Sequence, residues 1–336
     1  MNMTPSLNTA VVGLGWWGRQ IVESLSESRL VRVSVGVDPD TAAAQPFAET
    51  HGLRYVSGLE EALESDVDAV IIATPHKLHE QQVLGAASAG KHVFCEKPLA
   101  LDPVAARRMV DACRSRGLIL GVGHERRFEG ALEAIASMAR DGELGLLLHV
   151  DCNWSHDLFT RSQKPSWRQD PAQAPAGTLT ALGIHLTDYL ISVCGPIAEL
   201  RALTADRSER FPGDDIVTIQ LRFEAGMTGV ITNLAATPFH SRISLFGDAA
   251  WVEARENSNV DVPEPATLTW RGQDWETHSR TFAASNTVRA NLDQWAAAIA
   301  GVGDYRFTEE QLVHNVEVLD AIVRSADADG SVVTLR

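Results

Sequence analysis

The first residues with chemical meaning in this 336-residue chain are three glycines, Gly13, Gly15 and Gly18, spaced as G-x-G-x-x-G after a short apolar run. In such a turn the first glycine lets the chain leave a strand, the second lets backbone approach a pyrophosphate, and the third lets the next helix pack closely. The helix N-terminus then offers N–H groups to the anion. The spacing predicts a dinucleotide-binding turn, in which Trp16 and Trp17 either cover the pyrophosphate or pack as ordinary apolar side chains.

An acidic residue follows at the distance that a dinucleotide site requires. The predicted strand 31–38 ends in Asp38, about 20 residues beyond the glycines, where a carboxylate can bind the ribose 2′-hydroxyl. Pro39 and Asp40 come next, and no Arg or Lys occurs before residue 54. Because this negative charge opposes a 2′-phosphate, we expect NAD rather than NADP. The alternative role of Asp38 is that of a solvated turn residue.

The bulk composition limits the class of protein. The formal net charge of −15 gives a surface that repels nucleic acid and anionic lipid, so neither is expected as a partner. The first residues lack the features of a secretory signal, and no apolar run approaches the ~20 residues that span a membrane. We therefore expect a cytoplasmic protein with no membrane partner.

The cysteines and the other possible ligands do not predict a metal site. The four cysteines are widely spaced and form no C-x-x-C pair, so we expect reduced thiols in the core and neither a zinc site nor a disulfide framework. No Cys/His cluster or carboxylate cage with the spacing of metal ligands stands out. We expect no metal.

The first part of the chain alternates apolar runs with segments of helical period, which is typical of a parallel sheet covered on both faces. The expected strands are 9–13, 31–38, 54–56, 68–74, 92–96 and 118–123, and the expected helices are 16–28, 40–50, 59–64, 78–89 and 103–116. In an open sheet of this kind ligands bind at the carboxyl ends of the strands. Thr74, Glu96 and Gly123 each end a strand, so we expect them at one edge.

After residue 124 the pattern changes. Runs of alternating apolar and polar residues between 198 and 270 indicate an antiparallel sheet, and helices are expected at 129–141, 178–194, 286–300 and 308–325. We therefore predict an α/β protein of two domains. Residues 1–124 form a doubly wound, parallel nucleotide-binding domain, and residues 125–336 form an α/β domain with a largely antiparallel sheet.

Further motifs occur in the order of a known family. The stretches A-T-P-x-x-x-H at 73–79, G-K-H-V-x-x-E-K-P at 90–98 and G-x-H-x-x-D at 183–188, together with the glycine turn and Asp38, resemble the Gfo/Idh/MocA (glucose-fructose oxidoreductase, inositol dehydrogenase and MocA-like) family. The resemblance covers essentially the whole chain. It implies an NAD-dependent dehydrogenase of sugars or cyclitols, with a Rossmann domain and an open-faced second sheet for substrate binding and oligomerisation. A small-molecule substrate and a homodimer or homotetramer are expected.

The resemblance places the lysine of E-K-P, Lys97, beside the nicotinamide and the substrate hydroxyl. A lysine that is partly desolvated near the positive nicotinamide has a lowered pKa and can take or hold a proton. Lys97 is therefore the first candidate for catalysis, and Glu96 is implied near the nicotinamide ribose. Pro98 is expected either to turn Lys97 into the site, with a cis bond as one route, or to be an ordinary loop residue.

The A-T-P-x-x-x-H stretch is expected at the cofactor. The resemblance implies cofactor contacts for Thr74 and Pro75. For His79 two roles stay open, a cofactor contact and internal packing.

The resemblance also implies a second catalytic residue, His185, which can exchange the substrate proton with Lys97 or polarise a carbonyl. The alternative is a buried histidine bonded to a neighbouring element. Many family members carry an Asp four residues earlier, where this chain has Ala181. Asp188, on the same helical face as His185, is expected to support it beside the substrate or only to hold the helix.

The resemblance implies that three further residues lie at the substrate. Arg127 opens the second domain, and Trp167 and Arg168 precede the helix that carries the histidine. If the two arginines face the substrate, a carboxylate- or phosphate-bearing compound is favoured, because guanidinium groups bind such anions bidentately.

Two other functions compete with net dehydrogenation. One is NAD-dependent elimination or glycoside cleavage through transient oxidation, and the other is a dinucleotide-binding regulator without catalysis. The departure at Ala181 favours the regulator, whereas Glu96, Lys97 and His185 argue against it.

Overall fold

A computed structural model describes residues 6–160, 175–176, 179–211, 213–259, 262 and 264–335. The chain forms two compact units. The first contains residues 1–125 and 286–313, and the second contains residues 126–285 and 314–336. The predicted second domain was continuous from residue 125, whereas in the structure the chain returns to the first unit for 28 residues before it ends in the second.

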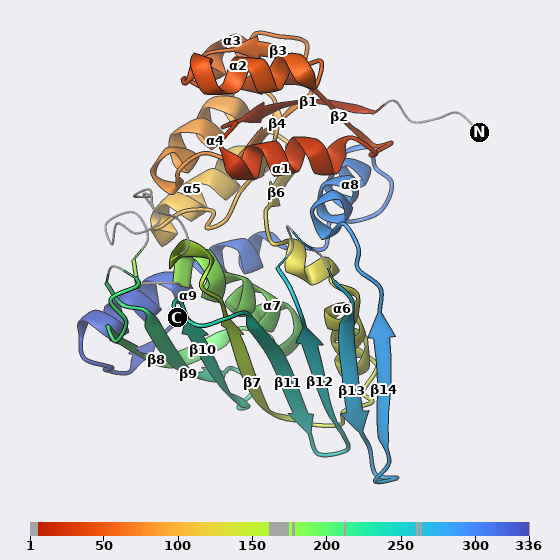
Figure 1. The fold of residues 1–336 in the computed structure, drawn as a ribbon, viewed down its shortest axis with the longest axis vertical. Helices are drawn as coiled ribbons and strands as arrows, with labels where there is room; N and C mark the ends of the chain where they lie inside the picture. Colours follow the sequence, from red (N-terminus) through yellow and green to blue (C-terminus); the bar gives the residue numbers. More distant parts are fainter. Residues whose placement is uncertain are drawn as a thin grey trace. The chain divides into compact units, whose positions relative to one another are not determined.

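The first unit is built on a parallel sheet with the strand order β3-β2-β1-β4-β5-β6 (Figure 1). Its strands are β1 (Leu7–Val12), β2 (Val31–Val37), β3 (Arg54–Val56), β4 (Ala69–Ile72), β5 (His92–Cys95) and β6 (Leu120–Val122). The order reverses between β1 and β4, which is the position where doubly wound sheets bind ligands. The predicted parallel sheet is confirmed, strand by strand.

Helices follow the strands as the periodicity predicts. They are α1 (Trp16–Leu25), α2 (Thr41–Thr50), α3 (Leu59–Leu63), the 3₁₀ turn η1 (His76–Leu78), α4 (His79–Ser88) and α5 (Pro103–Arg114). The start of α5 has the expected local cause, because the Asp102 carboxylate accepts hydrogen bonds from the N–H groups of Val104 and Ala105, and Pro103 occupies the first helical position.

A helix from near the end of the chain, α8 (Thr287–Ile299), completes the core of the first unit. Trp295 is fully buried, and its ring meets that of Phe94 edge-on at a centroid distance of 5.6 Å. The Asn291 side chain donates to the Val122 carbonyl at 2.8 Å. The helix was predicted, but an apolar helical face does not reveal which of two sheets it will cover.

The second unit contains a nine-stranded mixed sheet with the order β14-β13-β12-β11-β7-β10-β9-β8-β15. The strands are β7 (Leu147–Ser155), β8 (Ile197–Ala205), β9 (Ile216–Phe223), β10 (Thr228–Leu234), β11 (His240–Gly247), β12 (Trp251–Glu256), β13 (Ala266–Arg271), β14 (Thr277–Phe282) and β15 (Val333–Thr334). Only the pairing of β7 with β10 is parallel among the pairings described. The largely antiparallel sheet is therefore confirmed.

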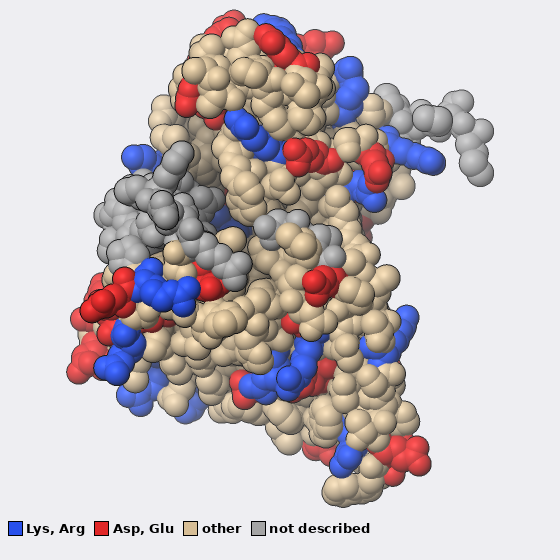
Figure 2. All heavy atoms as spheres, in the orientation of Figure 1, with Lys and Arg blue, Asp and Glu red and all other residues tan. Residues whose placement is uncertain are grey.

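One face of this sheet is covered by helices α6 (Gly130–Arg140), α7 (Ile184–Cys194) and α9 (Glu309–Asp327), as Figure 1 shows. The opposite face carries ion pairs, such as Arg242 with Asp151 at 2.8 Å and Arg255 with Glu253 at 2.6 Å. On the side of the molecule drawn in Figure 2, acidic and basic side chains are interspersed.

The cysteines and the lengths of the helices can also be compared with the predictions. All four cysteines are buried free thiols, as expected. Among the helices of the described residues, none has the length and apolar character needed to cross a bilayer.

Candidate functional site

The glycine turn lies at the carboxyl end of β1 and is held by close backbone contacts. Gly13 has φ of +94°, and a Cβ there would lie 2.8 Å from the Ala73 carbonyl oxygen. A Cβ on Gly18 would lie 1.8 Å from the Gly13 carbonyl oxygen. Around Gly15, which caps α1, a Cβ would meet no atom within 4 Å. The first and third glycines thus close the turn, while the second leaves space beside the helix N-terminus, as a pyrophosphate requires.

Asp38, directly after β2, is tied to the same turn. One carboxylate oxygen accepts the Leu14 N–H at 2.8 Å, and the other accepts the Asp40 N–H at 2.9 Å. Each carboxylate oxygen can accept a second hydrogen bond, because a carboxylate offers about four lone-pair directions. The geometry therefore leaves Asp38 able to accept from ribose hydroxyls, and it also gives the residue a structural role that the spacing did not reveal.

The two tryptophans of the turn differ in exposure. Trp16 is 50% exposed, whereas Trp17 is partly buried and packs against the core of the first unit. Their ring centroids are 5.5 Å apart. Packing therefore accounts for Trp17, and Trp16 keeps an open ring beside the turn.

Of the residues predicted to contact cofactor after β4, His79 occupies a different place. Its side chain is 0% exposed, and its ring nitrogens lie 2.9 Å from the Pro98 carbonyl oxygen and 3.0 Å from that of Thr74. Burial lowers the pKa of His79, although these carbonyls oppose the shift. The structure therefore agrees with internal packing as the role of His79. Thr74 and Pro75 are partly exposed at the end of β4.

The E-K-P residues follow β5 at the same edge. Glu96 is 6% exposed, and its carboxylate accepts the Lys97 N–H at 3.2 Å. Lys97 is half-buried, and its bond to Pro98 is cis. A Cβ on Gly123, the residue after β6, would lie 2.4 Å from the Glu96 carboxylate. The expected neighbourhood of Glu96 and Gly123 is therefore present, and Gly123 leaves the space that the carboxylate fills.

In the second unit, His185 lies in the first turn of α7 and is 2% exposed. Its ring meets that of Trp154 edge-on at a centroid distance of 5.3 Å. A π-helical turn, Leu179–Gly183, precedes the helix. Such turns are rare and occur frequently at functional sites. Ala181 belongs to this turn, whereas Trp167 and Arg168 lie outside the described residues.

Arg127 and Asp188 form a buried, bidentate ion pair with each other. The Arg127 guanidinium donates to both Asp188 carboxylate oxygens at 2.7 Å, and both side chains are at most 4% exposed. The pair ties the segment before α6 to α7. This geometry agrees with the alternative in which Asp188 holds the helix, and it gives Arg127 an internal partner that the sequence did not predict. Substrate contact by either residue stays a prediction.

A second buried polar group lies in the same unit and was not predicted. The Arg126 guanidinium lies 4.0 Å over the Trp154 ring and forms an ion pair with Glu256, which also accepts from Ser241 at 2.6 Å. Asn233 donates to the Trp154 carbonyl at 2.7 Å. Within the part of the chain that the structure describes, Trp154 Nε1, Asn233 Oδ1 and Glu256 Oε1 are buried and have no hydrogen-bond partner.

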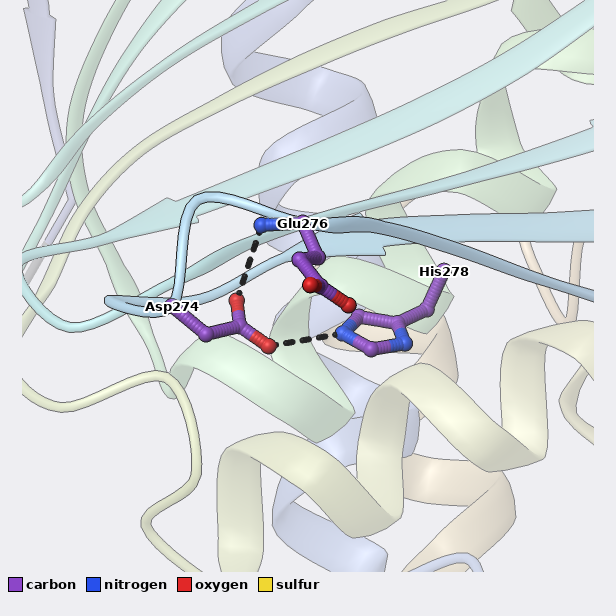
Figure 3. A group of neighbouring side chains, drawn as sticks. All are labelled: Asp274, Glu276 and His278. Carbon is purple, nitrogen blue, oxygen red and sulfur yellow. Dashed lines mark hydrogen bonds and ion pairs between the residues drawn. The ribbon is translucent and has the colours of Figure 1, made fainter.

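The hairpin between β13 and β14 carries side chains that could hold a cation. Asp274, Glu276 and His278 bring ligand atoms within 4.8 Å of one another, the one such group found among the described residues (Figure 3). Asp274 and Glu276 are exposed, and His278 Nε2 lies 2.9 Å from Asp274 while its ring stacks on Trp270. The D-x-E-x-H spacing was the missed sequence signal.

Comparison with known proteins gives matches in both units. Residues 7–124 match the family described as an oxidoreductase family with an NAD-binding Rossmann fold. Residues 132–253 match the Gfo/Idh/MocA C-terminal domain.

Individual relatives agree with these matches. An uncharacterized oxidoreductase of Streptococcus pneumoniae is 32% identical over 219 residues, which are 63% of this chain and only 58% of that protein. A 1,5-anhydro-D-fructose reductase of Ensifer adhaerens is 29% identical over 286 residues, 83% of this chain and 84% of the reductase. The crystal structure of GenD2 from gentamicin A biosynthesis, in complex with NAD, has a TM-score of 0.84 and 26% identity, and covers 100% of this chain and 98% of its own.

Proposed function

Because the chain belongs to the Gfo/Idh/MocA oxidoreductase family, with an NAD-binding Rossmann domain in its first unit, we propose that it transfers a hydride between NAD and a secondary alcohol or ketone. The substrate class is a sugar, a cyclitol or a related polyhydroxy compound. The observation that carries this proposal is the carboxyl edge of the first sheet, where the glycine turn, Asp38, Glu96 and Lys97 follow β1, β2 and β5.

The residues of the first unit suit the cofactor. The space at Gly15 and the N-terminus of α1 would hold the pyrophosphate, and Asp38 would accept from the adenosine ribose. Thr74 and Glu96 would serve the nicotinamide half. When bound, NAD supplies the hydride acceptor or donor, while the protein orients the reactants and excludes water.

Two residues would transfer the proton to and from the substrate hydroxyl. Lys97 is half-buried, and an amine at the strand end can take or hold the hydroxyl proton. His185 would exchange that proton or polarise the carbonyl oxygen.

A polyhydroxy substrate suits the buried polar group of the second unit. Hydroxyl groups both donate and accept, so they can satisfy the indole N–H of Trp154 and the acceptor oxygens of Asn233 and Glu256. These three atoms have no partner in the described ranges of the chain. The reductase relative, which by its name acts on an anhydrosugar, supports the same class. An anionic group on the substrate remains part of the proposal through Arg168.

We also propose that the protein is a homodimer or homotetramer. Helices cover one face of the second sheet, and the apolar side chain of Leu203 on β8 is 50% exposed. Static light scattering at two protein concentrations measures the assembly, and a monomer at both would contradict it.

The test is a panel of polyols, sugars and hydroxy acids incubated with NAD and followed by the absorbance of reduced nicotinamide. We expect cofactor reduction with at least one polyhydroxy compound, and loss of that signal in Lys97→Ala. Lys91→Ala is the matched control. Lys91 directly precedes β5, at the opposite end of the strand from Lys97, and its ammonium donates to the Val67 carbonyl at 2.7 Å. A converted substrate without net cofactor reduction would indicate elimination or glycoside cleavage instead. NAD binding without any conversion would favour a regulator.

A further inference from the structure

His79 is a buried histidine whose ring bridges two segments of the cofactor edge. It is the first residue of α4 and is 0% exposed. Nδ1 lies 2.9 Å from the Pro98 carbonyl oxygen, and Nε2 lies 3.0 Å from the Thr74 carbonyl oxygen. Thr74 follows β4 and Pro98 follows β5, and these strands are neighbours in the sheet. The ring therefore lies within hydrogen-bond distance of both strand ends, and a neutral ring donates to one of the two carbonyls.

The segment that His79 contacts is the one that carries Lys97. Pro98 follows Lys97 directly through the cis bond, and the Lys97 N–H is held by the Glu96 carboxylate at 3.2 Å. The backbone of Lys97 is thus fixed from one side by Glu96 and from the other by the tie between Pro98 and His79. A shift of the Pro98 carbonyl would move the base of the Lys97 side chain.

The protonation state of the imidazole decides how many of the two carbonyls it can donate to. A neutral ring donates from one nitrogen, and a protonated ring donates from both. Either form therefore donates to at least one of the two carbonyls. A leucine in the same place would fill a similar volume and donate to neither.

We propose that His79 is a positioning residue for Lys97, because its ring donates from Nδ1 to the Pro98 carbonyl and so ties the residue after Lys97 to the start of α4 at the cofactor edge. The inference rests on the proposed role of Lys97 in hydride transfer. It assigns His79 no contact with cofactor or substrate.

The experiment measures the environment of Lys97 directly. Limiting acetic anhydride acetylates amines, and peptide mass spectrometry at a series of pH values gives the relative rate and apparent pKa for each lysine. The chain has four lysines. The exposed Lys77 and the tethered Lys91 serve as internal references in the same digest. This readout requires no substrate and is made with and without NAD.

Three variants distinguish a hydrogen bond to the Pro98 carbonyl from one to the Thr74 carbonyl. In His79→Asn the amide nitrogen lies near the place of Nδ1 and can still donate to Pro98. In His79→Gln it lies near the place of Nε2 and can donate to Thr74 instead. His79→Leu donates to neither. The matched control is His92→Leu, because His92 Nδ1 accepts the Ile119 N–H at 3.0 Å at the opposite end of β5.

We expect His79→Leu and His79→Gln to change the labelling rate of Lys97 relative to Lys77, while His79→Asn stays close to the wild type. With a substrate from the panel, kcat should fall by up to about 100-fold in His79→Leu, the loss expected for a misplaced catalytic group, with the Kd for NAD within about threefold. His92→Leu should lower Tm and leave Lys97 labelling unchanged. If His79→Leu does not fold, the contrast between Asn and Gln gives the same answer.

Unchanged Lys97 labelling in all three variants would overturn the inference, whatever their stability. Equal disturbance by Asn and Gln would overturn it as well, since the Pro98 tie would then be irrelevant. A failure of the proposed function is distinguishable, because it would appear as normal turnover in Lys97→Ala and would not alter the labelling result for His79.

Discussion

The replacement of Gly15 by alanine separates binding from stability at the cofactor turn. Gly15 has φ of −67° and ψ of −171°, an extended conformation that any residue adopts. An added Cβ meets no atom within 4 Å, whereas the same change at Gly18 places a Cβ 1.8 Å from a backbone oxygen. The two glycines of one motif should therefore respond to the same substitution in opposite ways.

The expected magnitudes follow from these contacts. Gly15→Ala should leave stability unchanged or raise it by about 0.4–1 kcal/mol, because alanine reduces the entropy of the unfolded chain. The methyl group should instead occupy the approach of the pyrophosphate and cost the equivalent of one hydrogen bond to a charged group, about 1.5–3 kcal/mol or a 10- to 150-fold rise in the Kd for NAD. Gly18→Ala should lose about 1–3 kcal/mol of stability or more, because backbone cannot move aside as a side chain can.

The assay is thermal unfolding of each variant without cofactor, together with titration of NAD by tryptophan quenching. A lowered Tm in Gly15→Ala with unchanged affinity would refute the assignment of this space to the pyrophosphate. Equal stability of Gly18→Ala and the wild type would refute the packing role of the third glycine.

Three further outcomes are expected. Gly123→Ala should displace the buried Glu96 carboxylate and cost about 1–3 kcal/mol, seen as a lower midpoint in urea; a midpoint equal to the wild type would contradict this. Asp188→Asn removes the carboxylate charge that faces the buried Arg127, so a loss of about 3–5 kcal/mol in the free energy of unfolding is expected, and unchanged stability would show that the pair is not a structural tie. Since the pKa of His79 is lower in the folded state than its unfolded value near 6.5, the unfolded state binds the proton more readily, and stability should fall as the pH drops below about 6.5; His79→Gln should show a shallower fall in Tm between pH 7.5 and 5.5, and a parallel fall would contradict the neutral, buried histidine.

The fold of the first unit could be predicted because its signals are local. Apolar runs of strand length alternate with helical segments, and glycine or proline stands at the turns, so each element follows from nearby residues. The assignment of α8 to this unit could not be predicted in the same way. The apolar side of 287–299 would suit either sheet, and contacts between distant residues, such as Trp295 with Phe94 and Asn291 with Val122, place it on the first.

In the candidate site, too, features with local signals could be predicted and pairings between distant residues could not. The glycine turn and Asp38 were predicted because each follows a strand that ends at the same edge of one sheet, whereas the roles of the E-K-P residues were implied by the family resemblance. The pairing of Arg127 with Asp188 joins residues 61 positions apart, and a helical pattern specifies the face of each residue but not its partner. The place of His79 inside the protein was left open for a related reason, since a histidine near a strand end suits both a ligand and two backbone carbonyls.

The central claim is that Lys97 serves proton transfer and not cofactor binding, and one comparison tests it most directly. The steady-state turnover of Lys97→Ala and of the wild type is measured on a substrate from the panel, with the Kd for NAD determined for both. A general acid–base group contributes about 10²–10⁴-fold, so the variant should lose at least about 100-fold in kcat while its affinity for NAD stays close to the wild type. Near-normal turnover in Lys97→Ala would contradict the account.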